Sequence, residues 1–147
     1  MQKEKRMPSK AGSEKPVQEK DRTILVADDE EDLRMILQMT LEDPRYRILE
    51  AADGTTALIL AQTECPDLVI LDWMMPGMSG LEVVKALRRH PKTQQIPVIL
   101  LTARDHDQER AEGKAAGVCA YLVKPFSPLE LLEKVWEVFS ADENELG

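Results

Sequence analysis

The sequence predicts an α/β protein in which five strands of a parallel sheet alternate with five helices. Short apolar runs rich in β-branched residues recur along the chain and end at turn residues, which is typical of strands buried on both faces. Segments with apolar residues at helical spacing separate these runs. This alternation favours a doubly wound sheet that is covered by helices on both faces.

The strands and helices are expected in a regular order. Strands are expected at residues 23–27, 46–51, 68–72, 96–102 and 120–124. Helices are expected to start within the acidic run 28–32, at 55, after Ser79, at 105 and after Ser127. Serine followed three residues later by glutamate is a capping-box pattern, and it marks the third helix at Ser79 and Glu82 and the fifth at Ser127 and Glu130.

Apolar residues at helical spacing predict which face of each helix packs against the sheet. In the first helix these residues are Leu33, Ile36, Leu37 and Leu41. In the last helix they are Leu131, Leu132, Val135, Val138 and Phe139. The fourth helix is highly charged, and its thin apolar face consists of Ala111, Ala115 and Ala116.

The length and charge of the chain limit its organisation. With 147 residues, the chain fits one domain with one core. We expect a disordered charged leader over 1–21, a folded domain over 22–140 and a frayed acidic tail over 141–147. Residues 1–22 hold seven Lys or Arg and four Asp or Glu, a net of +3, which leaves −11 for the rest of a chain whose total is −8. A domain this acidic is not expected to bind nucleic acid directly, but it suits a cation.

The composition also points to a compartment. No run is long enough to span a membrane and the charged N-terminus lacks the apolar segment of a signal peptide, so we expect a cytoplasmic protein with no membrane partner. Cys65 and Cys119 lie far apart and show no metal-ligand spacing. We expect both as small, buried or half-buried residues in a reducing environment.

Polar side chains stand at the ends of four predicted strands. Asp28 and Asp29 follow the first strand, Asp72 closes the third, Thr102 the fourth and Lys124 the fifth. The carboxyl ends of parallel strands lie at one edge of a sheet, so we expect these groups to come together. Three carboxylates in one cleft repel each other unless a hard cation lies among them, and Mg²⁺ is the usual cation for a small carboxylate site.

This set of groups suits a phosphoryl group. Asp72 would be the nucleophile that forms an aspartyl phosphate. Mg²⁺, held by Asp28, Asp29 or both, would neutralise charge on the phosphoryl oxygens. Lys124 would supply a positive point charge, and Thr102 a neutral donor. Each residue taken alone has a more ordinary explanation, such as a helix cap or a solvated side chain. Together these explanations are less favoured, because all of them would have to hold at four strand ends on the same edge of the sheet.

In these residues the sequence resembles the receiver domain of two-component response regulators, in particular the single-domain receivers of chemotaxis. The resemblance covers about residues 22–140 and rests on Asp28-Asp29, on Asp72 with Met75-Pro76-Gly77 and Gly80, on Thr102-Ala103, and on Lys124-Pro125-Phe126. It implies a flavodoxin-like fold with strand order 2-1-3-4-5.

The resemblance also implies the phosphoacceptor and its metal ligands. Asp72 is implied as the phosphoacceptor and as a Mg²⁺ ligand. Asp28 and Asp29 are implied as the acidic pair, with Asp29 the more direct ligand of Mg²⁺. The backbone carbonyl of Met74 is implied as a further ligand.

The remaining implied roles lie on the fourth and fifth strands. Lys124 would contact the phosphoryl group and would precede a cis bond to Pro125. Thr102 would be the switch hydroxyl that moves toward the phosphate. Tyr121 would be the aromatic residue that rotates inward with it, and an ordinary half-buried strand aromatic explains Tyr121 equally well.

Three functions compete. The first is a phospho-accepting switch, which is not an enzyme for a separate substrate. It would take a phosphoryl group from a histidine kinase or histidine phosphotransfer protein and present an altered surface to a downstream target or output domain. The second, an enzyme of Mg²⁺-dependent phosphoryl transfer, is disfavoured because the chain has no P-loop, GxGxxG motif or nucleophile elbow. The third is an unphosphorylated pseudo-receiver that only binds proteins. The charged fourth helix is expected to be a solvated surface, with a homodimer on activation as the alternative.

Overall fold

The computed structural model describes residues 22–146 except 104–106, with side chains described as far as residue 141. The predicted leader over 1–21 therefore lies outside the described residues, as does the predicted start of the fourth helix at 105.

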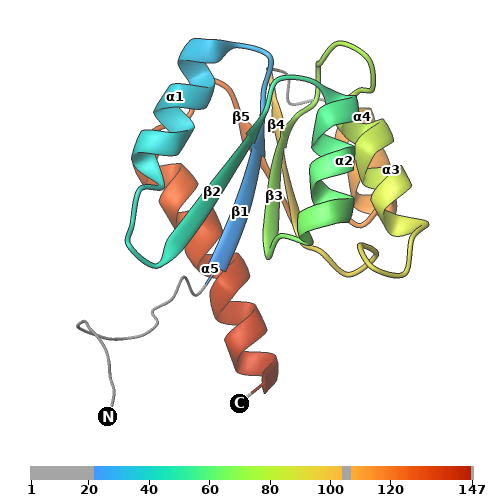
Figure 1. Ribbon diagram of the computed structural model, residues 1–147. Coiled ribbons are helices and arrows are strands. Elements are labelled where there is room, and N and C mark those ends of the chain that lie inside the picture. The colour runs from blue at the N-terminus through green and yellow to red at the C-terminus, as the bar shows by residue number, and fades with distance from the viewer. Residues whose placement is uncertain (1–21, 104–106, 147) are drawn as a thin grey trace.

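Strands and helices alternate along the described part of the chain, as predicted (Figure 1). The strands are β1 (Arg22–Ala27), β2 (Tyr46–Ala51), β3 (Leu68–Asp72), β4 (Val98–Thr102) and β5 (Ala120–Val123). The helices are α1 (Glu31–Thr40), α2 (Gly54–Glu64), α3 (Gly80–Arg88), α4 (Asp107–Ala115) and α5 (Pro128–Leu146).

All neighbouring strands pair in parallel, and their order is β2-β1-β3-β4-β5. The predicted fold class and strand order are therefore confirmed, including the edge position of β2. β3 lies at the centre of the sheet, between β1 and β4, and all five of its residues are buried. This central position explains why the sequence of β3 is apolar without alternation.

The two faces of the sheet carry separate apolar cores. Ile24 and Val26 of β1 pack on the side of α1 and α5, whereas Leu25 and Ala27 pack on the side of α2 and α3. Figure 1 shows the same division, with α1 and α5 on one side of the sheet and α2, α3 and α4 on the other. Because strand side chains alternate in direction, one short strand supplies both cores.

Both predicted capping boxes are present. The Ser79 hydroxyl accepts a hydrogen bond from the backbone N–H of Glu82, and the Glu82 carboxylate accepts one from the backbone N–H of Ser79. Ser127 and Glu130 form the same pair of bonds at the start of α5. The paired bonds satisfy backbone donors that the first turn of a helix leaves open.

The predicted helix faces need three corrections. Ile36 of α1 and Leu132 of α5 are exposed, not buried. Leu131, Val135 and Phe139 form the buried stripe of α5 at a spacing of four residues, and Leu132 lies about 100° around the helix from Leu131.

The predicted alanine face of α4 is confirmed only at Ala116, which is half-buried and packs against the core. Ala111 and Ala115 are exposed, and the buried residue of α4 is Gly113. A Cβ at Gly113 would overlap the hydroxyl of Tyr121, so the helix approaches β5 too closely for a side chain at this position.

Several boundaries differ from the prediction. β4 begins at Val98 and not at 96, because the backbone of Ile96 turns back to bond Thr93. β5 ends at Val123, one residue before Lys124. α5 continues to Leu146, so the described part of the stretch expected as a frayed tail, residues 141–146, is helical.

Both cysteines are exposed, which contradicts the expectation that they are buried or half-buried. Cys65 follows α2 in the left-handed conformation, at φ 47°, and so lies in a surface turn. Cys119 immediately precedes β5. Among the described residues, no helix has both the length and the apolar character needed to cross a bilayer.

Candidate functional site

Two buried carboxylates meet at the carboxyl edge of the sheet. Asp72 is the last residue of β3, and Asp28 immediately follows β1, the neighbouring strand. Asp28 is fully buried and Asp72 is 5% exposed. Buried carboxylates at this depth need partners, because desolvation strongly disfavours an isolated charge.

Lys124 is the common partner of both carboxylates. Its Nζ lies 3.1 Å from Oδ2 of Asp72 and 3.3 Å from Oδ2 of Asp28. The backbone fixes this approach, because the N–H of Lys124 donates to the carbonyl of Thr102 at 2.7 Å. A residue from the end of the fifth strand is therefore held against residues from the first and third, as predicted from the common carboxyl edge of parallel strands.

The acidic cluster offers a set of oxygen ligands. Carboxylate oxygens of Asp28, Asp29 and Asp72 lie within 4.8 Å of one another. The two neighbours differ: Oδ1 of Asp28 accepts from the backbone N–H of Glu30 at 2.9 Å and its Oδ2 faces Lys124, whereas Asp29 is exposed. Three carboxylates in one cleft, one of them open to solvent, fit a hard divalent cation such as Mg²⁺.

The charges at this edge shift each other's protonation. Burial and the neighbouring Asp28 raise the pKa of Asp72 to about 6, while Lys124 opposes the shift. Burial alone would lower the pKa of Lys124, but the carboxylates of Asp72 and Asp28 raise it above its usual value. At neutral pH Asp72 is thus mainly ionised and Lys124 is fully charged, which is the state in which a carboxylate can act as a nucleophile.

The predicted switch residues lie on the β4–β5 side. Thr102 is buried at the carboxyl end of β4. Tyr121 is half-buried on β5, and its hydroxyl donates to the backbone carbonyls of Glu109 at 3.0 Å and Arg110 at 3.1 Å. The side chain of Met74 is 73% exposed in the loop after β3.

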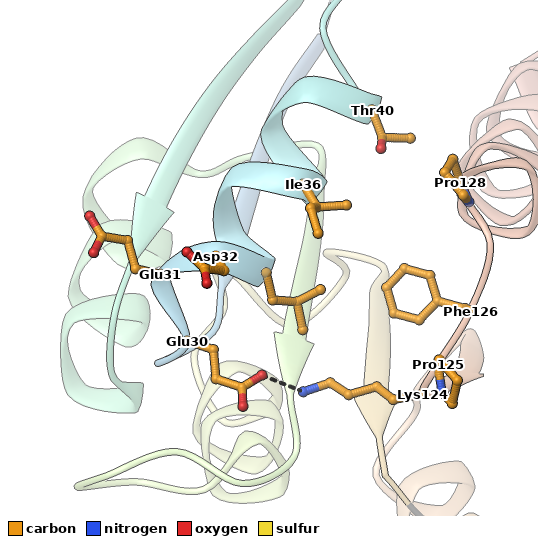
Figure 2. A pocket seen from close by; sticks show the side chains of 10 residues that line it. Glu30, Glu31, Asp32, Ile36, Thr40, Lys124, Pro125, Phe126 and Pro128 are labelled. Carbon is orange, nitrogen blue, oxygen red and sulfur yellow. Dashed lines mark ion pairs between the residues drawn. The ribbon is translucent and has the colours of Figure 1, made fainter.

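A pocket of about 860 Å³ lies beside the acidic cluster, between the start of α1 and the segment that joins β5 to α5. Figure 2 shows Ile36 and Phe126 facing each other across it, with Lys124 and Glu30 at one end. Nζ of Lys124 lies 3.9 Å from Oε1 of Glu30, which is a third acidic contact. This pocket explains why Ile36 is not part of the core.

Sequence reasoning missed two neighbours of the site. From the sequence, Glu30 is only one residue of the acidic run in which the first helix starts, and its contact with Lys124 is not predicted. Arg34 was not considered, although its guanidinium Nη1 donates to the backbone carbonyl of Asp28 at 2.7 Å. The available signal is a single basic residue two positions after the acidic run 28–32, and that signal does not say which group the arginine reaches.

The fold and the site together define a class of α/β protein with an acidic, lysine-containing site at the carboxyl edge. A sequence model of the response regulator receiver domain matches residues 24–136. The chain therefore belongs to the response regulator receiver domain family. Receiver domains are signalling switches of two-component systems. They bind Mg²⁺ at an acidic pocket and interact with histidine kinases and output domains.

Individual relatives agree with this family. The chain is 45% identical over 112 residues to the phosphate regulon transcriptional regulatory protein PhoB of Rhizobium meliloti, an alignment that covers 76% of this chain and 49% of that protein. It is 40% identical to the alkaline phosphatase synthesis transcriptional regulatory protein PhoP of Bacillus subtilis, over 84% of this chain and 50% of that one. The chain thus spans about half the length of the curated relatives it matches.

Solved structures match over nearly their whole length. The chemotaxis protein CheY4 of Vibrio cholerae aligns with a TM-score of 0.75 at 38% identity, covering 80% of this chain and 98% of that one. A response regulator from Chloroflexus aurantiacus aligns with a TM-score of 0.76 at 34% identity, covering 82% and 99%.

Proposed function

We propose that this chain is a phospho-accepting receiver in which Asp72 takes a phosphoryl group from a phosphohistidine. The observation that carries the proposal is the position of Lys124, whose Nζ lies within 3.3 Å of both Asp72 and Asp28. In the transfer, an oxygen of Asp72 bonds to phosphorus, and the bond from phosphorus to the histidine nitrogen breaks with its electron pair remaining on the imidazole. Lys124 then pairs with an oxygen of the transferred group.

The acidic cluster would hold the metal ion. Asp28, Asp29 and Asp72 supply carboxylate oxygens, and we assign the backbone carbonyl of Met74 as a further ligand. Bound Mg²⁺ supplies neutralisation of charge on the phosphoryl oxygens. The open carboxylate of Asp29 makes it the more direct ligand, because both oxygens of Asp28 already have protein partners.

The proposed switch runs through β4 and β5. Thr102 supplies a hydroxyl that moves toward the phosphoryl group, and Tyr121 responds with it. Because the Tyr121 hydroxyl bonds the backbone of α4, movement of Tyr121 changes the surface formed by α4, β5 and α5. A downstream protein target or an output domain would recognise that surface, and the phosphodonor would be a histidine kinase or a histidine phosphotransfer protein.

The test is the intact mass of the protein after incubation with acetyl phosphate, with and without Mg²⁺. In this assay the bond from phosphorus to the acetyl oxygen breaks, and acetate leaves with the electron pair. We expect the wild type to gain one phosphoryl group only when Mg²⁺ is present. The Asp72→Asn variant should gain none, because an amide lacks the nucleophilic oxygen.

Asp53→Asn is the matched control. Asp53 caps α2 and is not one of the carboxylates of the acidic cluster, and asparagine is also a good helix cap, so this variant should be phosphorylated like the wild type. Phosphorylation of Asp72→Asn would assign the phosphoacceptor to another residue. No mass gain in a folded wild type would favour the alternative, an unphosphorylated pseudo-receiver that acts as a protein-binding module.

A further inference from the structure

Arg34 of α1 is a basic residue held at the edge of the acidic cluster. Its side chain is only 17% exposed, although the arginine belongs to the polar first turns of a surface helix. Its guanidinium reaches two other segments: Nη1 donates to the backbone carbonyl of Asp28 at 2.7 Å, and Nε faces Oε1 of Glu50 on β2 at 3.4 Å. The planar guanidinium thus links α1, the end of β1 and the edge strand.

The carbonyl that Arg34 holds belongs to the peptide between the two acidic neighbours. Every other polar group of Asp28 is also bonded. Its N–H donates to the carbonyl of Ala51 at 3.1 Å, and its two carboxylate oxygens accept from the backbone of Glu30 and from Lys124. Asp28 is therefore fixed by hydrogen bonds to four other residues, and Arg34 supplies the bond on the side of Asp29.

Asp29 has no comparable support from its own side chain. It is exposed, and no described residue donates a hydrogen bond to its carboxylate. The position of its carboxylate therefore depends on the backbone before it, which is the Asp28–Asp29 peptide. Groups behind a metal ligand orient that ligand, and removing such groups commonly weakens metal affinity.

We propose that Arg34, anchored on Glu50, is a positioning residue that holds the Asp28–Asp29 peptide so that Asp29 can bind a divalent cation. The inference rests on the proposed function, because it assumes that the acidic cluster is a cation site. It makes a prediction opposite to simple electrostatics. The charge of Arg34 repels a cation, so removing it would tighten cation binding if charge were its main contribution.

The test is a titration of ¹⁵N-labelled protein with MgCl₂, in which the backbone amide shifts of Asp29 and Trp73 report binding. We expect the dissociation constant of Arg34→Met for Mg²⁺ to rise about tenfold or more. Arg34→Lys should weaken binding as well, because an ammonium keeps the charge but cannot bridge both acceptors. Glu50→Gln should have the smallest effect, because the amide oxygen still accepts from Nε of Arg34.

Arg47→Met is the matched control. This variant also removes one positive charge, but Arg47 pairs with Glu64 on the exposed surface, at 3.2 Å, and not with the acidic cluster. Its affinity for Mg²⁺ should equal that of the wild type. The dispersion of the amide spectrum shows whether each variant is folded. If Arg34→Met does not fold, the Mg²⁺ affinity of Arg34→Lys tests the role of Arg34. Unchanged or tighter Mg²⁺ binding in a folded Arg34 variant contradicts the positioning role of Arg34 but leaves the proposed function unaffected. A wild type without Mg²⁺-dependent shifts overturns the cation site of the proposed function itself.

Discussion

The two halves of the carboxyl edge are built differently. On the β1–β3 side, the last four residues of β1 and all of β3 are buried, and the acidic groups continue directly from these strands. β4 is fully buried too, and the difference begins beyond it, where Leu122 is the buried residue of β5 and Gly113 is the buried residue of α4. Elements with few buried contacts open and shift at lower free energy than the central strands. The phosphoacceptor thus stands on the rigid half, and the predicted switch residue Tyr121 on the loosely packed half.

β5 connects the two halves. Lys124 follows this strand and contacts Asp72 and Asp28, whereas Tyr121 lies three residues earlier and bonds the backbone of α4. A change of charge at Asp72 acts directly on Lys124, because the ammonium of Lys124 contacts the Asp72 carboxylate at 3.1 Å. We therefore expect the loosely packed half to respond to chemistry on the rigid half through this one short strand.

Two glycine-to-alanine variants test this difference most strongly. Gly80 lies against the backbone of the rigid half, since a Cβ there would overlap the backbone carbonyl of Asp72 and approach Cδ2 of Leu100 to 3.1 Å. Neither a strand backbone nor a buried leucine yields easily. We expect Gly80→Ala to lower the free energy of unfolding by about 3 kcal/mol, measured by urea denaturation.

Gly113→Ala is the counterpart on the loosely packed half. Its Cβ would overlap the hydroxyl of Tyr121, which is the far end of a side chain and is able to move. The higher helix propensity of alanine offsets part of the loss, so we expect a net cost of about 1 kcal/mol. An equal or larger loss in Gly113→Ala than in Gly80→Ala would show that the two halves are equally rigid.

The second prediction concerns how much the ionised form of Asp72 lowers the free energy of unfolding. The native pKa of Asp72, about 6, lies above its ordinary value of 3.8, so the native protein binds this proton more tightly than the unfolded chain. The ionised group therefore destabilises the fold above pH 6, and the penalty disappears as the pH falls toward 4. Without Mg²⁺, we expect Asp72→Asn to be more stable than the wild type by about 1–2 kcal/mol at pH 8.

Urea denaturation of both proteins at pH 8 and pH 4.5, with a chelator present, measures this difference. Asp53→Asn should have the opposite effect and lower the free energy of unfolding at neutral pH. Hydrogen bonds from the backbone and side chain of Thr56 lower the pKa of Asp53, so its ionised form stabilises the fold at neutral pH. A stability gain for Asp72→Asn that does not shrink between pH 8 and pH 4.5 would contradict the shifted pKa.

The strand ends could be read from the sequence, because a buried strand is a short apolar run and its end is marked by a polar residue. Asp28, Asp72, Thr102 and Lys124 were placed in this way, and the structure brings Lys124 against both aspartates. The order of the strands came from the family resemblance and not from the residues themselves. Periodicity alone does not say which strands are neighbours.

Helix faces and long side chains could be predicted less well. Helical spacing locates an apolar stripe but not its edges, and so Ile36 and Leu132 were assigned to the core although they are exposed. Gly113 has no side chain and gives no apolar signal, yet it is the residue of α4 that faces Tyr121. The contact of Arg34 with Asp28 depends on the reach and direction of one side chain, which residue patterns do not encode.

The smallest expected effect comes from the hydroxyl that joins β5 to α4. Tyr121→Phe removes the bonds to the carbonyls of Glu109 and Arg110 and keeps the ring, so we expect a loss of about 1 kcal/mol in the free energy of unfolding. Tyr46→Phe is the control, because Tyr46 packs its ring against Phe139 and should tolerate the change. Hydrogen exchange sharpens the test: in Tyr121→Phe the amides of α4 should exchange faster while those of β3 stay protected, since the loss falls on the loosely packed half. Faster exchange in β3 and α4 alike would mean that the two halves open together, and that the site moves as one unit.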